Sequence, residues 1–114
     1  MGKSFFITGM GIEIYHKDIE TSVDWSTAIR RAARLNYNGE GWRLPSIKEL
    51  EFMNTLYLSG IGNFHSRGYW SCDGVEDNYE EAWAFDMGTS PWKWKDPIRK
   101  TNTVRPVRDI KSNI

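Results

Sequence analysis

The sequence predicts an α+β fold in which two amphipathic helices pack on an antiparallel sheet with long loops. Two segments have apolar residues at helical spacing, and each follows a residue that can cap a helix. Short runs rich in aromatic and β-branched residues lie before and after them, separated by Gly, Pro, Asn and Asp. Strands, two helices and then several strands is an order typical of an α+β domain.

The first strands are expected at residues 5–7 and 12–16. Ile12 and Ile14 alternate with Glu13 and Tyr15, which is the pattern of a half-buried strand. Because Gly9 to Gly11 forms a flexible turn between the two runs, we expect a hairpin or a bent strand.

The first helix is expected to begin after a cap at Ser22 or Asp24 and to end at Asn38–Gly39. Its apolar positions follow helical spacing and should face the core: Trp25, Ala28, Ile29, Ala32 and Leu35.

The stretch GEGWRLPSIKEL, residues 39–50, predicts a fixed corner between extended chain and the second helix. Pro45 keeps Leu44 extended, so Trp42 and Leu44 point the same way. Ser46 can cap the helix, and Glu49 can bond back to the amide of Ser46, which makes a capping box. The helix should bury Ile47, Leu50, Met53 and either Leu56 or Tyr57, and it should end near Ser59–Gly60.

Four further strands are expected after the second helix, at residues 69–71, 82–87, 92–95 and 103–108. Turn sequences at residues 88–91 and at Asp96–Pro97 separate them. The acidic stretch 73–81 is expected to be a solvated loop.

Composition limits the class of protein. The chain has 114 residues, which predicts one domain over residues 1–114. Fifteen basic residues balance fifteen acidic ones, and this neutral balance disfavours nucleic acid and anionic membranes as partners. No stretch predicts membrane insertion or a signal peptide, so we expect cytoplasmic synthesis. Cys72 is the single cysteine, which excludes an internal disulfide.

Five ordered motifs carry a resemblance that covers nearly the whole chain: VDWSTAIRRAARL, GWRLPSIKEL, GYWSCDG, EAWAFDM and VRPVR. Together they resemble the bacterial and phage family typified by the C-terminal domain of the collagen-like adhesin Lcl. The resemblance implies a C-type lectin-like fold, with more distant kinship to the formylglycine-generating sulfatase-modifying enzymes, which share the Arg-Leu-Pro corner. Because this fold serves many functions, the resemblance implies the scaffold first.

The residues do not predict an enzyme, and we expect no catalytic residues and no cofactor. The formylglycine-generating enzymes need two cysteines to hold copper, whereas this chain has only Cys72. A hydrolytic site needs a nucleophile, a base and an orienting acid. His16 and His65 are the only imidazoles, and neither lies in a recognisable nucleophile motif.

We predict no metal site, although the acidic stretch leaves calcium open. Residues 73–81 supply many oxygen ligands, but they lack the spacing of an EF-hand and the signatures of calcium-dependent lectins. One cysteine and two distant histidines do not make a zinc site.

The predicted ligand or partner surface is the segment around Trp92, Lys93, Trp94 and Lys95, supported by Arg99 and Lys100. Strand alternation turns the two tryptophans to one face and the two lysines to the other, so only one pair can be buried. The other tryptophans lie in apolar patterns and are expected in the core: Trp25, Trp42, Trp70 and Trp83. Arg43 and Arg105 are expected to pair with buried carboxylates such as Glu49 or Asp86.

These observations predict a non-catalytic binding or assembly module, a component of a larger phage or bacterial complex such as a virion. The alternatives are a calcium-independent domain that binds a glycan or polyanion, and an enzyme of unrecognised type. Six tryptophans favour a binding surface, because Trp is preferred for stacking and at interfaces. A protein partner, a glycan or polyanion, and self-association as a homo-oligomer all remain open.

Overall fold

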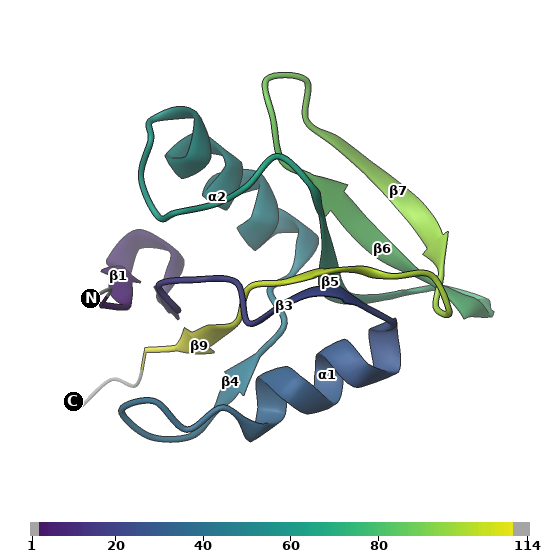
Figure 1. The fold of residues 1–114 in the computed structure, drawn as a ribbon, viewed down its shortest axis with the longest axis horizontal. Helices are drawn as coiled ribbons and strands as arrows, with labels where there is room; N and C mark the ends of the chain where they lie inside the picture. Colours follow the sequence, from purple (N-terminus) through teal and green to yellow (C-terminus); the bar gives the residue numbers. More distant parts are fainter. Residues whose placement is uncertain (1–2, 111–114) are drawn as a thin grey trace.

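A computed structural model describes residues 3–110, which form an α+β fold with two α-helices and two sheets (Figure 1). The helices are α1 (Trp25–Arg34) and α2 (Ile47–Leu58). The smaller sheet has the order β1-β2-β9-β4, formed by Phe5–Ile7, Ile12–Ile14, Val107–Asp109 and Trp42–Arg43. The larger sheet has the order β3-β8-β5-β6-β7, formed by Glu20–Val23, Asn102–Val104, Gly68–Val75, Asn78–Asp86 and Trp92–Pro97.

The predicted α+β fold with two helices is confirmed, but the strands form two sheets and not one. All strand pairs are antiparallel except β5 with β8, which is parallel. None of the helices formed by residues 3–110 combines the length and the apolar character that crossing a bilayer requires.

The N-terminal hairpin forms as predicted, with Phe5 opposite Ile14 and Ile7 opposite Ile12. A 3-10 helix, η1 (Thr8–Met10), and Gly11 at φ 67° connect the strands. The expectation of a solvent face on this hairpin is wrong at Glu13, which is only 2 % exposed. Arg108 donates hydrogen bonds to the Glu13 carboxylate. It also donates to the carbonyl of Asn38, which lies in the loop between α1 and β4.

The first helix differs from its prediction at both ends. Asp24 is the N-cap and accepts a hydrogen bond from the Thr27 amide at 2.9 Å, whereas Ser22 lies in the unpredicted strand β3. The helix ends at Arg34 and not at Asn38–Gly39, because Leu35 adopts an extended conformation. Ile29, expected in the core, is 42 % exposed, since the narrow buried stripe of α1 consists of Ala28 and Ala32.

The corner before α2 forms as predicted. Trp42 and Leu44 are buried, and Ser46 and Glu49 make both bonds of the capping box. The side chains of Ile47, Leu50 and Met53 are buried beneath the helix.

The strand predicted at residues 103–108 is two strands, because the chain passes from one sheet to the other at Arg105–Pro106. β8 ends at Val104 in the larger sheet, and β9 begins at Val107 in the smaller one. Pro106 has no N–H to donate to a ladder, which fits an interruption at this point.

The larger sheet separates two apolar clusters, with α2 on one face and α1 on the other. Tyr69 and Phe85 belong to the cluster beneath α2. Their neighbours along β5 and β6, Trp70 and Ala84, belong to the cluster beneath α1. This alternation fixes which face each residue of the neighbouring strand β7 must occupy.

Two expectations about residues 73–85 are wrong. The acidic stretch is not a loop, because most of it lies in β5 and β6. Only the two-residue turn Glu76–Asp77 separates these strands. Asp77 has φ 64°, the left-handed conformation that Asp tolerates in turns. Trp25 and Trp83, both predicted in the core, are only partly buried, whereas Trp42 and Trp70 are buried as expected.

Candidate functional site

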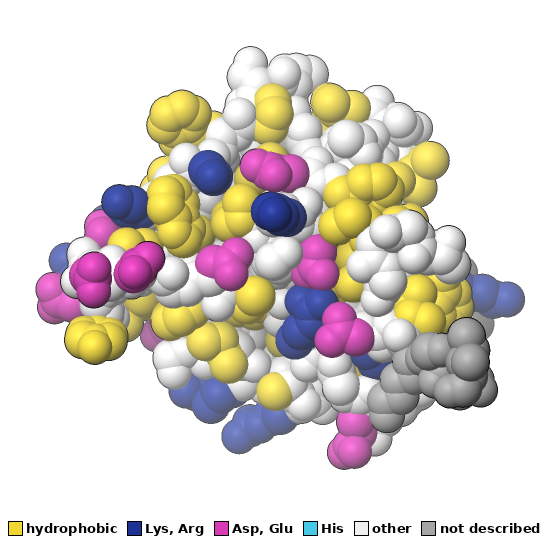
Figure 2. Space-filling view, turned by 180° about the vertical axis from the view of Figure 1, so that it is seen from behind, with side chains coloured by type: hydrophobic (Ala, Val, Ile, Leu, Met, Phe, Trp, Pro, Cys, Tyr) yellow, Lys and Arg dark blue, Asp and Glu magenta, His cyan; other side chains and the backbone are white. Residues whose placement is uncertain are grey.

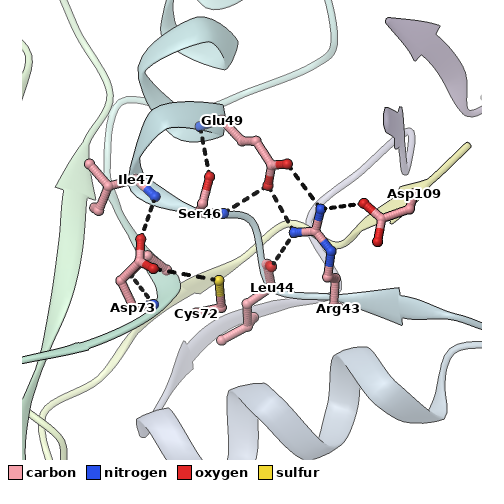
Figure 3. A network of polar contacts seen from close by, with 9 residues as sticks. Arg43, Leu44, Ser46, Ile47, Glu49, Cys72, Asp73 and Asp109 are labelled. Atoms are coloured by element: carbon pink, nitrogen blue, oxygen red, sulfur yellow. Dashed lines mark hydrogen bonds and ion pairs between the residues drawn. The ribbon is translucent and has the colours of Figure 1, made fainter. Parts of the chain in front are cut away.

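The polar network at the corner serves the fold (Figure 3). Arg43 donates to both carboxylate oxygens of Glu49, at 2.8 and 2.9 Å, and to Asp109 at 2.7 Å. Burial acts to raise the pKa of Glu49, but the hydrogen bonds from Arg43 and Ser46 outweigh it and hold the pKa below its ordinary value. The predicted Arg43–Glu49 pair is therefore confirmed, and Arg43 has a second carboxylate partner in Asp109.

Asp73, from the acidic stretch, also supports this corner. Its Oδ2 accepts a hydrogen bond from the Ile47 amide at 2.8 Å, at the start of α2 (Figure 3). A carboxylate at a helix N-terminus satisfies an amide that has no partner inside the helix. Across residues 3–110, no three His, Cys, Asp or Glu side chains gather in a way that could hold a metal ion.

A second charged cluster is buried where the loop after α2 meets the sheets. Arg105 is fully buried and pairs with Asp18 at 3.0 Å, and not with Asp86, which is exposed. Asp18 also accepts a hydrogen bond from Tyr69, and its Oδ2 lies 3.0 Å from His65 Nδ1. Arg105 donates to the carbonyls of Gly62 and Asn63, at 2.7 Å each. Together these bonds tie the loop to the sheets.

The side chains that the sequence offers as a nucleophile or a base lie in different surroundings. Burial and the neighbouring Asp73 carboxylate raise the pKa of the Cys72 thiol, which disfavours the nucleophilic thiolate. Burial lowers the pKa of His16, which packs against Tyr15 and Tyr37. The side chain of His65 is 47 % exposed and contacts Asp18.

The predicted binding residues lie on β7 and in the turn after it. Trp92 is 67 % exposed, and Lys93 and Lys95 are exposed as well. Trp94 is partly buried and packs on the cluster beneath α1. The expected alternation is therefore present, but the two tryptophans have different environments. Arg99 and Lys100 are exposed in the turn that follows β7, at the other end of the strand from Trp92.

Strand pairing adds Trp83 to this group, which the sequence interpretation had assigned to the core. Trp83 lies opposite Lys95 in the β6–β7 ladder, and Phe85 lies opposite Lys93. The ammonium groups of Lys93 and Lys95 lie over the Trp83 ring, 5.4 and 5.5 Å from its centroid. Both distances are within the range of a cation–π interaction.

A groove of about 480 Å³ lies beside these side chains, between α2 and the β6–β7 pair. Its lining residues are Glu51, Asn54, Trp83, Phe85, Pro91, Trp92 and Lys93. The two side-chain bonds between Asn54 and the Gly88 backbone, at 2.8 and 3.1 Å, hold the β6–β7 connection against α2. We refer to Trp83, Trp92, Lys93 and Lys95 with this groove as the β6–β7 surface.

Figure 2 shows how charge is distributed around this region. Acidic side chains gather at the left edge, where the β5–β6 turn lies, and basic and hydrophobic side chains lie next to one another above them.

Glu51 and Asn54 were missed by the sequence interpretation, because only the packing of α2 against β6 brings them to the groove.

A larger depression of about 620 Å³ lies on the outer face of the smaller sheet. Two of its charged groups are already paired, since Arg108 donates to Glu13 at 2.6 and 3.1 Å. Arg108 also bonds to the Asn38 and Glu40 carbonyls and stacks on Trp42. The β6–β7 surface, with an exposed indole and two exposed ammonium groups, is the better candidate for binding.

The family model of the Lcl C-terminal domain matches residues 12–108. The chain belongs to the Lcl C-terminal domain family. The match spans both helices and all the strands from β2 to β8. None of the curated proteins compared with the chain matches it. The resemblance carried by the sequence motifs is thus confirmed for the Lcl C-terminal domain family, while the C-type lectin likeness and the kinship to the sulfatase-modifying enzymes remain predictions.

Proposed function

We propose that this Lcl C-terminal domain is a non-catalytic binding or assembly module, part of a larger phage or bacterial complex, and that the β6–β7 surface contacts its partner. The observation that carries the proposal is the exposed Trp92, which lines the same groove as Trp83. Trp is the side chain most enriched among residues that dominate interface energies. A single exposed indole is ordinary, but Trp92 lines a groove that Lys93 also lines, so a partner can contact both an aromatic ring and a cation there.

The chemistry of Cys72 and Asp18 supports a non-catalytic role. The raised pKa of Cys72 keeps its thiol protonated near neutral pH. Asp18 receives bonds from Arg105 and Tyr69 in addition to its contact with His65, so its bonds serve to fix a loop.

The test is to isolate the protein from its native source under mild conditions and to measure how capture of the associated partner depends on the surface. Wild type and the Lys93→Ala/Lys95→Ala variant are compared at equal amounts of folded protein. We expect the variant to lose most of the captured partner with little change in melting temperature, because both lysines are exposed. The matched control is Arg30→Ala/Arg34→Ala on α1, which removes two exposed cations from another element. Equal capture by wild type and the lysine variant would contradict the proposal.

The second candidate is calcium-independent binding of a glycan or polyanion. It is favoured by the two ammonium groups that lie within 5.5 Å of the Trp83 ring centroid, since an anionic sugar could contact both. Glycan binding that persists in a metal chelator, falls with salt and is lost in Lys93→Ala/Lys95→Ala would favour this candidate.

A further inference from the structure

β7 is one of the two edge strands of the larger sheet, and the phase of its ladder with β6 shows which of its backbone groups point outward. Residues of an antiparallel pair alternate between hydrogen-bonded pairs and pairs whose backbone groups point away from each other. The Ile98 amide donates to the Glu80 carbonyl at 2.9 Å, just beyond the end of β7. Counting back from this bonded pair, Trp92, Trp94 and Asp96 direct their backbone groups toward β6. Lys93 and Lys95 direct theirs toward the open edge.

The positions of the lysine side chains support the assignment of Lys93 and Lys95 to the pairs without hydrogen bonds. Side chains in the pairs without hydrogen bonds lie closer together across the ladder. Lys95 lies opposite Trp83, and its ammonium group is 5.5 Å from the ring centroid of that residue.

Prolines limit the open edge at both ends. Pro91, directly before β7, and Pro97, its last residue, have the same outward phase as the lysines. Neither proline has an N–H, and proline is one of the devices that protect edge strands. The edge therefore offers the N–H and C=O groups of Lys93 and Lys95, enough for a short added strand.

The same lysines determine which strand can be added. If β7 of a second copy paired along this edge, lysines of both copies would lie beside one another, and like charges in adjacent strands are destabilising. A segment with Asp or Glu at alternate positions would instead place carboxylates next to Lys93 and Lys95. Charge complementarity thus selects an acidic strand and rejects self-pairing.

We propose that the edge of β7 binds an extended, acidic segment of a partner protein by strand addition between Pro91 and Pro97. This inference rests on the proposed function, since it uses the same surface, and it narrows the partner to a polypeptide with acidic side chains at alternate positions. Trp92, at the start of β7, lies where it can cover an apolar side chain near one end of that segment.

The test uses a capped seven-residue peptide that alternates Glu with Val or Thr, titrated into wild type, Lys95→Ala and Lys95→Pro. Lys95→Ala removes the charge, whereas Lys95→Pro removes the charge and also the outward N–H, without removing a bond to β6. We expect Lys95→Pro to weaken binding about tenfold more than Lys95→Ala, as the loss of one backbone hydrogen bond predicts. N-methylation of the peptide amides that face β7 should weaken binding by a similar factor.

Amide hydrogen exchange provides the second measurement. In the free protein the Lys93 and Lys95 amides should exchange faster than those of Trp94 and Asp96, and the peptide should slow them. Strand addition would be overturned if the peptide bound Lys95→Ala and Lys95→Pro equally well, or if the N-methylated and unmodified peptides bound wild type equally well. Either result would show that the contact is electrostatic and does not use backbone hydrogen bonds. Failure of the peptide to bind would overturn it as well.

The two proposals fail in different ways. If the captured native partner depends on Lys93 and Lys95 while the acidic peptide does not bind, the inference about strand addition is wrong and the proposed function stands. If capture of the partner is unchanged in Lys93→Ala/Lys95→Ala, the proposed function is wrong, and the inference falls with it.

Discussion

Single buried charges anchor the loops of this domain. Arg105 makes bonds to Asp18 and to three backbone carbonyls, those of Tyr15, Gly62 and Asn63. Its guanidinium also lies 4.2 Å from the centroid of the Phe64 ring. Removing this side chain takes away the donors to the buried Asp18 carboxylate and to the three carbonyls.

Arg105→Ala should therefore destabilise the domain by about 3 to 5 kcal/mol, because it leaves the Asp18 carboxylate buried without its charge partner. Arg99→Ala is the matched control, since Arg99 is exposed, and it should change stability by less than about 0.5 kcal/mol. Chemical denaturation measures both. Equal stability of the two variants would show that the buried pair does not hold the loop.

Glu49 makes stability depend on pH. Its pKa in the folded protein lies below its ordinary value, so its contribution to stability is present above the pKa of the unfolded chain and is lost as the pH falls through the folded pKa. Wild type should lose stability as the pH is lowered from about 5. Glu49→Gln should be less stable than wild type at neutral pH and should lose less on acidification. Parallel curves for the two proteins would contradict this role of Glu49.

At the scale of elements, the start of α2 depends on two residues that act together. Ser46 accepts a hydrogen bond from the Glu49 amide at 3.1 Å, and Glu49 accepts one from the Ser46 amide at 2.8 Å. Glu49 also holds Arg43, which links the helix to the smaller sheet.

Ser46→Ala should cost about 0.5 to 2 kcal/mol, the usual range for an N-cap. The double variant Ser46→Ala/Glu49→Ala should cost less than the sum of the two single variants, because both residues serve one capping box. Trp42→Ala, which empties a buried site at the same corner, should cost about 3 to 5 kcal/mol. A melting temperature unchanged by Trp42→Ala would show that the corner does not need the indole.

The corner and α2 were predictable because their signals are local. A proline, a capping serine and a glutamate three residues later specify the geometry without reference to the rest of the chain. β3 and the split at Arg105–Pro106 were not predictable in this way, since both depend on pairing with distant strands. The path of the chain after α1 is also non-local, because Arg108, from the other end of the chain, bonds to the carbonyls of Asn38 and Glu40.

At the scale of the whole molecule, the larger sheet brings the candidate surface together. The segment from Trp92 to Lys95 was identified from its alternating aromatic and basic residues. The addition of Trp83 required the register of β6 with β7, and the addition of Glu51 and Asn54 required the packing of α2 on that sheet. Alternation alone could not show that Trp94 packs on the core while Trp92 is exposed, because the two occupy the same face at different depths in the sheet.

The central claim is that the β6–β7 surface binds the partner through Trp92. The most direct test compares two variants, Trp92→Ala and Trp94→Ala. For each variant, the affinity for the captured partner and the melting temperature are measured. We predict that Trp92→Ala weakens binding at least about tenfold with an almost unchanged melting temperature, as expected for an exposed interface anchor. Trp94→Ala should lower the melting temperature, because its ring packs on the cluster beneath α1. Wild-type affinity in a folded Trp92→Ala variant would contradict the claim.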